Sequence, residues 1–135
     1  MSFADVGPVI VLSFLLINFL MSAYEKIHDW KSTLLFYGKM YESTSLAKGI
    51  TPAIVLIIGL EIIISTLAAL GIWDILINQD YHFAVYAFIA SSILFTILLF
   101  GLRVVKDYSG SARIAIYFLI SVFGLYWTQS IMSIA

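Results

Sequence analysis

The stretch from Pro52 to Ile72 reads PAIVLIIGLEIIISTLAALGI and decides the fold class. Apart from Glu61, Ser65 and Thr66, its residues are apolar or glycine. A helix needs about 20 mostly apolar residues to cross the roughly 30 Å hydrocarbon core of a bilayer. Because lipid offers the backbone no hydrogen-bond partners, such a segment satisfies its peptide groups internally. The stretch therefore predicts a membrane-spanning helix.

Three further segments have the same character, at residues 6–24, 83–102 and 114–134. The whole chain of 135 residues is 62% hydrophobic and 11% charged, whereas soluble domains are about 45–50% apolar and about 25% charged. We therefore expect one membrane domain over residues 1–135, an all-α integral membrane bundle of four antiparallel helices with spans at about 6–24, 52–72, 83–102 and 114–134.

The basic residues are sorted along the chain. All 7 Lys and Arg lie in two connections, residues 25–51 and 103–113. They are Lys26, Lys31, Lys39, Lys48, Arg103, Lys106 and Arg113. Under the positive-inside rule these connections face the cytoplasm, so both termini lie outside. We expect a multi-pass protein of the bacterial inner membrane.

The first connection contains an unusually apolar segment at residues 33–41, TLLFYGKMY. It is too short to span a bilayer and too apolar to be disordered. An interfacial helix or a re-entrant segment at the cytoplasmic end of the bundle is the preferred interpretation. An ordered loop with aromatic contacts is the alternative.

Glu61 lies near the middle of the second predicted span. An acid there costs about 2.5–3.5 kcal/mol on insertion scales, so it should face the bundle interior. Since no Lys or Arg falls within a predicted span, we expect Glu61 to be protonated. The candidate hydrogen-bond partners are Asn18, Tyr117, Ser91, Ser92 and Ser121. Glu61 then either relays protons or binds a polar ligand head such as that of a quinone, or it is an interhelical packing contact.

Several function classes are excluded or disfavoured. With no Cys there is no disulfide, thiolate metal site or cysteine nucleophile. The only two histidines are His28, which follows the first predicted span on the cytoplasmic side, and His82, which precedes the third on the outer side. They cannot bind one haem iron together, so we expect no metal site. A net charge of −1 gives no electrostatic basis for nucleic-acid binding. No catalytic residue is evident, and a quinone or lipid is the cofactor class left open.

Short motifs along the chain resemble the DoxX-like family of small four-helix bacterial membrane proteins. The first helix ends in Tyr24-Glu25-Lys26-Ile27, the aromatic connection holds Phe36-Tyr37-Gly38-Lys39, and the second helix is centred on Gly59-Leu60-Glu61 and ends with Leu70-Gly71. Gly110–Arg113 then leads into Ile116-Tyr117-Phe118-Leu119. The resemblance implies association with membrane redox systems, including quinone-linked thiosulfate oxidation and oxidative-stress complexes.

The sequence therefore favours a small membrane subunit or anchor of a larger, redox- or quinone-linked complex, not catalytic alone. Its expected partners are the lipid bilayer and other membrane subunits. Two alternatives stay open. One is a quinone-interacting oxidoreductase subunit with Glu61 as proton acceptor, and the other is a proton-coupled carrier of a small hydrophobic solute.

Overall fold

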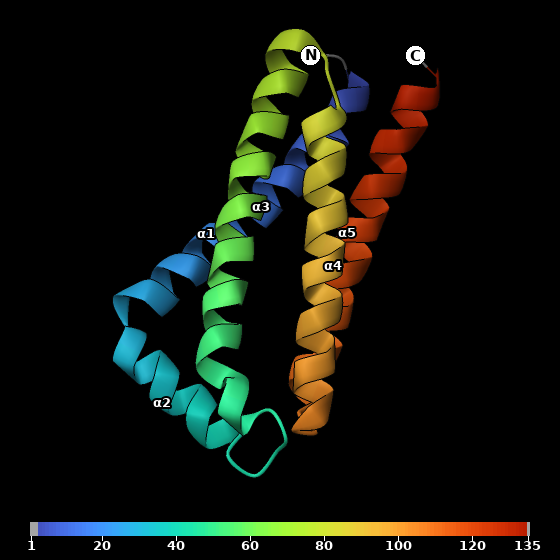
Figure 1. Cartoon of the computed structure of the whole chain (residues 1–135). Helices are drawn as coiled ribbons and strands as arrows, with labels where there is room; N and C mark the ends of the chain where they lie inside the picture. Colours follow the sequence, from blue (N-terminus) through green and yellow to red (C-terminus); the bar gives the residue numbers. More distant parts are fainter. Residues whose placement is uncertain (1–2, 135) are drawn as a thin grey trace.

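A computed structural model of the chain describes residues 3–134, and these are helical almost throughout (Figure 1). A short 3-10 helix, η1 (Phe3–Asp5), precedes α1, and a second, η2 (Ala47–Gly49), precedes α3. The α-helices are α1 (Val6–His28), α2 (Trp30–Met40), α3 (Ile50–Asn78), α4 (His82–Val104) and α5 (Tyr108–Ile134). The expected all-α class is confirmed.

Four of these helices, α1, α3, α4 and α5, are long and apolar enough to cross a membrane. This finding indicates a multi-pass membrane protein, and each predicted span falls within one of these four helices. The helices continue past the predicted ends: α1 runs to His28 and α5 already begins at Tyr108. Hydropathy marks only the apolar run, whereas backbone hydrogen bonds continue through the polar residues that flank it.

The apolar segment of the first connection is helical, as expected, and begins three residues earlier than predicted, at Trp30. The chain breaks at Asp29, where the backbone leaves helical geometry (φ −105°, ψ 49°). Helix α2 packs against the first half of α3 rather than across the ends of the other helices (Figure 1). The contact is an apolar cluster of Tyr41, Ile50, Ile54 and Ile58, covered by Trp30, Leu34, Tyr37, Met40, Leu46 and Val105.

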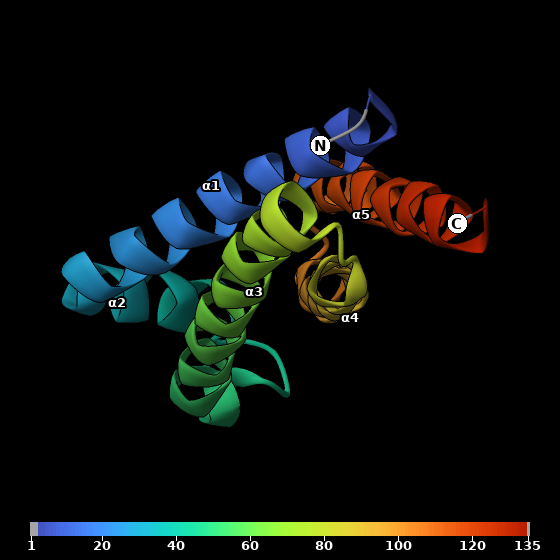
Figure 2. The same cartoon turned by 90° about the horizontal axis from the view of Figure 1, so that it is seen from above.

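The four long helices enclose one main core. Figures 1 and 2 show α1 crossing α3 and α5, while α4 runs beside α3 and α5. The two ends of the chain lie at the same end of the molecule, and α2 and the α4–α5 connection lie at the other (Figure 1). Fully buried Leu12, Leu15, Ile64, Phe88 and Leu94 form the centre of this core.

Close helix contacts depend on small residues. A Cβ added at Gly71 would lie 2.9 Å from the backbone nitrogen of Ala84, so glycine permits α3 and α4 to approach here. At the end that holds the termini, the hydroxyl of Tyr81 donates a 2.5 Å hydrogen bond to Asp5, whose side chain is fully buried. This bond ties the α3–α4 connection to the start of α1.

Candidate functional site

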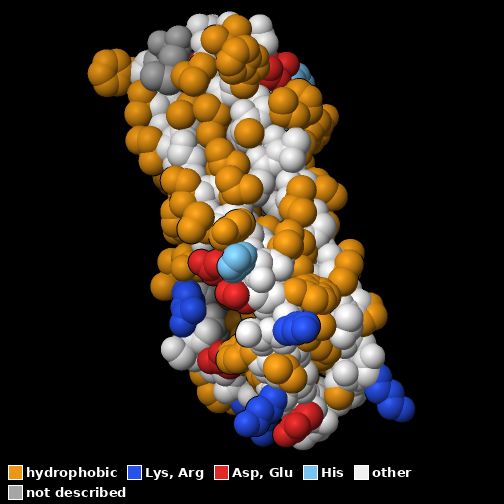
Figure 3. Space-filling model, turned by 90° about the vertical axis from the view of Figure 1, so that its left-hand side faces the viewer, with side chains coloured by type: hydrophobic (Ala, Val, Ile, Leu, Met, Phe, Trp, Pro, Cys, Tyr) orange, Lys and Arg blue, Asp and Glu red, His pale blue; other side chains and the backbone are white. Residues whose placement is uncertain are grey.

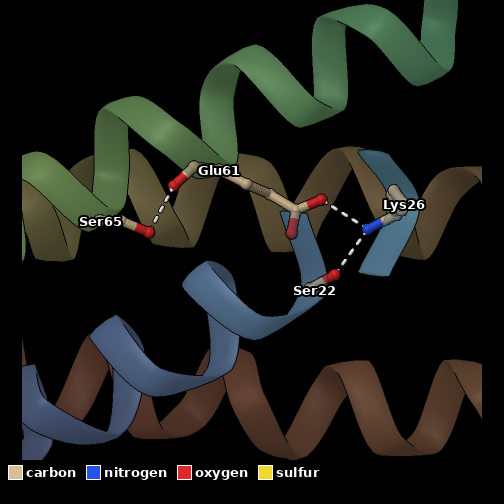
Figure 4. Close-up of polar contacts among 4 residues, drawn as sticks. All are labelled: Ser22, Lys26, Glu61 and Ser65. Carbon is tan, nitrogen blue, oxygen red and sulfur yellow. Dashed lines mark hydrogen bonds and ion pairs between the residues drawn. The ribbon is translucent and has the colours of Figure 1, made fainter. Parts of the chain in front are cut away.

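An ion pair joins α1 to α3 within the apolar part of the molecule. Lys26 Nζ lies 2.6 Å from Glu61 Oε1, and Glu61 is only 2% exposed, against 18% for Lys26 (Figure 4). The same ammonium donates to Ser22 Oγ, one helical turn back on α1, at 2.6 Å. Ser22 and Lys26 share one face of α1 because residues four apart are neighbours on a helix surface. The bond to Ser22 therefore holds the Lys26 ammonium on the side of α1 that faces α3.

The prediction that no cation reaches Glu61 is wrong. The first apolar run ends at Tyr24, but α1 continues to His28 and places Lys26 in its last turn. A lysine carries its charge on a flexible four-carbon stem, which can lie along an apolar surface and place the ammonium several ångströms from its own Cα. The ammonium of Lys26 thus supplies the compensating charge from just outside the predicted span.

The hydrogen-bond partners predicted for Glu61 are also wrong. Ser91 donates instead to Ser121 Oγ at 3.1 Å and to the carbonyl of Phe88 at 3.0 Å. The ring of Tyr117 contacts two phenylalanine rings, with centroids 5.9 Å from Phe14 and 5.8 Å from Phe95. Asn18 is half-buried on α1, and Ser92 donates to the carbonyl of Phe88. Within residues 3–134, none of these side chains bonds to the Glu61 carboxylate.

The second carboxylate oxygen of Glu61 takes no part in the ion pair with Lys26. Its Oε2 is buried and has no hydrogen-bond partner among the residues that the structure describes. Ser65 Oγ, one turn along α3, donates to the backbone carbonyl of Glu61 at 2.8 Å and not to the carboxylate. Buried polar atoms are almost always paired, so an unpaired carboxylate oxygen is a candidate position for a proton or a ligand donor.

A polar pocket lies beside this ion pair, where α1 breaks and α2 begins. We call it the elbow pocket; it has a volume of about 350 Å³ and is lined by Ser22, Glu25, Lys26, Asp29, Ser32, Thr33, Phe36 and Tyr37. Figure 3 shows the face of the molecule that carries the elbow. Charged side chains gather over its lower half, and hydrophobic side chains cover its upper half. The pocket is thus the meeting point of apolar and polar surface.

Tyr37 connects the pocket to the ion pair. Burial raises the pKa of the Tyr37 phenol above its usual value of 10.0, and the negative charge of Glu61 raises it further. The phenol therefore stays protonated and is a hydrogen-bond donor near Glu61 at neutral pH. Tyr37 comes from α2 and Glu61 from α3, so the site unites three helices.

Comparison with known proteins assigns no function to this arrangement. No protein-family model, curated protein or solved structure matches the chain. Between Phe3 and Ile134 no group of three or more His, Asp or Glu side chains is placed to hold a metal ion. The chemistry of the site therefore has to be argued from the side chains themselves.

Sequence reasoning found Glu61 but missed Lys26 and Tyr37. One signal pointed to Lys26: an acid at mid-span requires compensation, and Lys26 lies two residues past the end of the first predicted span. No comparable signal identified Tyr37, because its position depends on the direction in which α2 leaves the break at Asp29. The assembled site can donate hydrogen bonds, accept a proton and neutralise charge.

Proposed function

We propose that this chain is a small multi-pass subunit or anchor of a larger assembly in the bacterial inner membrane. One observation supports this proposal above the others. Only 17% of the most apolar window of α5 is buried within the chain, against 33% for each of the other three spans. The exposed side chains of α5 include Ile116, Leu119, Phe123 and Tyr126, spaced so that they share one face.

A partner helix is the occupant that fits this face. Large aromatic and branched side chains form ridges that pack into the grooves of another helix, and aromatic residues are enriched at protein interfaces. The small amount of polar surface between the spans leaves little room for a catalytic centre in this chain alone. Partner subunits would supply the catalytic centre.

The proposed orientation places four antiparallel helices in the bilayer with both termini outside. It is supported by the two basic connections, which lie at the end of the molecule opposite the termini (Figure 1), and by the positive-inside rule. The redox and quinone part of the proposal rests on the resemblance of the sequence to the DoxX-like family. Membership of that family is part of the proposal.

Photo-crosslinking from α5 tests the partner. A photoreactive residue at Phe123 should give adducts with another membrane protein in native membranes. The matched control is the same residue at Ile63, which is 54% exposed on α3, against 56% for Phe123, and which should give lipid adducts. Recovery of a solitary monomer, with lipid adducts alone from both positions, would contradict the subunit proposal.

A second candidate function is a quinone-interacting subunit in which Glu61 accepts the proton. The observation that favours it is the unpaired, buried Oε2 of a carboxylate whose other oxygen contacts Lys26. This candidate predicts that quinone copurifies with the protein and that Glu61→Gln abolishes quinone-dependent turnover in the assembly. Turnover that is unchanged in Glu61→Gln would exclude it.

A further inference from the structure

The exposed side of α2 combines large apolar side chains with unpaired cations. It consists of Lys31, Ser32, Leu35, Phe36 and Lys39, all of them exposed. These residues share one side of the helix because residues four apart lie one above the other. Leu35 is 75% exposed and Phe36 is 63% exposed. We propose that this side, the α2 face, binds anionic phospholipid, with the two apolar side chains among acyl chains and the two lysines on lipid phosphates.

The opposite side of α2 is already occupied. Its side chains pack on the apolar cluster that includes Ile54 of α3, and they are Trp30, Leu34, Tyr37 and Met40. This packing fixes the rotation of α2 about its own axis, so Leu35 and Phe36 cannot turn toward the interior. Within residues 3–134, no other side chain buries these two. The α2 face therefore needs a covering layer from outside the chain.

Lipid is the covering layer that the neighbouring surface favours. Helix α2 packs on the turns of α3 that carry Ile54 and Ile58. On the same turns, Val55 is 54% exposed and Leu56 is 59% exposed. Since α3 is one of the helices that are long and apolar enough to cross a membrane, these side chains face acyl chains. Helix α2 lies beside this part of α3 (Figure 1), so its exposed face meets the same lipid.

The two lysines determine which lipid headgroups fit. Among the Lys and Arg of residues 3–134, only Lys26 forms an ion pair, so Lys31 and Lys39 have no acidic partner. Each lies four residues from Leu35, which is about 6 Å along the helix axis. A lysine stem can lie along the apolar surface over that distance while its ammonium contacts a phosphate. Helices in which Lys flanks apolar side chains bind anionic bilayers through both interactions.

The charge of the whole molecule has the same direction. All 7 Lys and Arg lie in the two connections on the side of α2, and Figure 3 shows Lys and Arg side chains among hydrophobic ones over this half. The end that holds the termini carries Asp5, Asp74 and Asp80 instead. Helix α2 itself contains no acid, and Asp29 and Glu42 lie beyond its two ends. This distribution attracts an anionic headgroup, whereas a neutral one gains nothing from it.

Quenching of a single fluorophore by brominated lipids tests the proposal. The chain has no Cys, so Leu35→Cys provides one labelling site in the full chain. The labelled protein is reconstituted in liposomes of phosphatidylglycerol and phosphatidylcholine, with bromine on the acyl chains of one lipid or the other. We expect brominated phosphatidylglycerol to quench the label more strongly. The matched label at Ile10→Cys, a position that is 62% exposed on α1, should be quenched equally by both lipids.

Variants of the lysines test the headgroup contact. Each of Lys31→Gln and Lys39→Gln should lower the preference of residue 35 for phosphatidylglycerol about fivefold, the equivalent of one lysine near an anionic surface. Added salt should lower the preference as well. The control variant Lys48→Gln removes an exposed lysine outside the α2 face and should leave the preference unchanged.

Three results would overturn the proposal. They are equal quenching of residue 35 by the two brominated lipids, lysine variants that match Lys48→Gln while their circular dichroism matches the wild type, and a label that neither lipid quenches. In the last case, quenching by aqueous iodide would place the α2 face in water, and protection from iodide would indicate a protein cover. The liposomes contain no other protein and the same lipids in both leaflets. The outcome is therefore separate from the α5 partner and from the proposed orientation.

Discussion

Replacing Lys26 with methionine removes the charge that stabilises Glu61 and keeps an apolar side chain of similar length. At the observed separation of 2.6 Å, two unit charges attract by about 6 kcal/mol when the effective dielectric constant is 20. Desolvation offsets part of this attraction, and loss of one partner of a buried pair typically costs about 3–5 kcal/mol. Since Glu61 is only 2% exposed, water cannot replace the ammonium. We therefore expect Lys26→Met to destabilise the protein by about 3–5 kcal/mol.

The reverse change should cost less. In Glu61→Gln the ammonium of Lys26 keeps its bond to Ser22 and is 18% exposed at the elbow pocket. Loss of one charge-assisted hydrogen bond there costs about 1.5–3 kcal/mol. The double variant Lys26→Met/Glu61→Gln should be more stable than Lys26→Met alone, because in Lys26→Met the buried Glu61 has to take up a proton at neutral pH, whereas glutamine is neutral already.

The free energies of unfolding are measured by titration with sodium dodecyl sulfate in mixed micelles, followed by far-ultraviolet circular dichroism. The four proteins form a double-mutant cycle, which isolates the coupling between the two side chains. A coupling energy near zero would refute the ion pair as the main contact of Glu61, and equal costs for the two single variants would refute the predicted asymmetry between them.

Two further predictions concern helix contacts. Gly71→Ala should destabilise the protein by about 1–3 kcal/mol, since the new Cβ would lie 2.9 Å from the backbone of Ala84. Gly59→Ala is the matched control, because nothing lies within 4 Å of its added Cβ. The same unfolding titration compares the two variants. Tyr81→Phe should cost about 1–3 kcal/mol, because it removes a hydrogen bond to the buried carboxylate of Asp5. Burial and then the Asp5 carboxylate raise the pKa of Tyr81 from 10.0 to about 12. The stability that the protonated phenol of Tyr81 contributes is therefore complete below pH 10 and is lost as the pH rises to about 12. Phenolate absorbance of wild type minus Tyr81→Phe measures this shift, and a titration near pH 10 would contradict it.

The number and approximate position of the membrane helices were predictable from the sequence because the signal is strong. A run such as residues 52–72 has few alternatives to a spanning helix, given the cost of exposing peptide groups to lipid. The helix at Trp30–Met40 was also predictable, since its apolar side chains needed a surface. Glu61 was recognisable by the cost of a carboxylate at that depth.

The partners of Glu61 were not predictable by the same reasoning. A hydropathy window assigns Lys26 to the connection, and the reach of its side chain depends on how α1 crosses α3 (Figure 2). The position of α2 depends on the backbone at Asp29, which departs from helical geometry at one residue. Such a break has no strong sequence signature when neither proline nor glycine is present. Tyr37 and the elbow pocket therefore emerge only with the tertiary structure.

Infrared spectroscopy of the protonation state of Glu61 tests the central claim most directly. Spectra of the wild type, Glu61→Gln and Lys26→Met are recorded at neutral pH in lipid. If Lys26 and Glu61 form an ion pair, the wild type has no neutral carboxyl band that disappears in Glu61→Gln, and such a band arises in Lys26→Met. A neutral carboxyl band in the wild type that Glu61→Gln abolishes would contradict the ion pair.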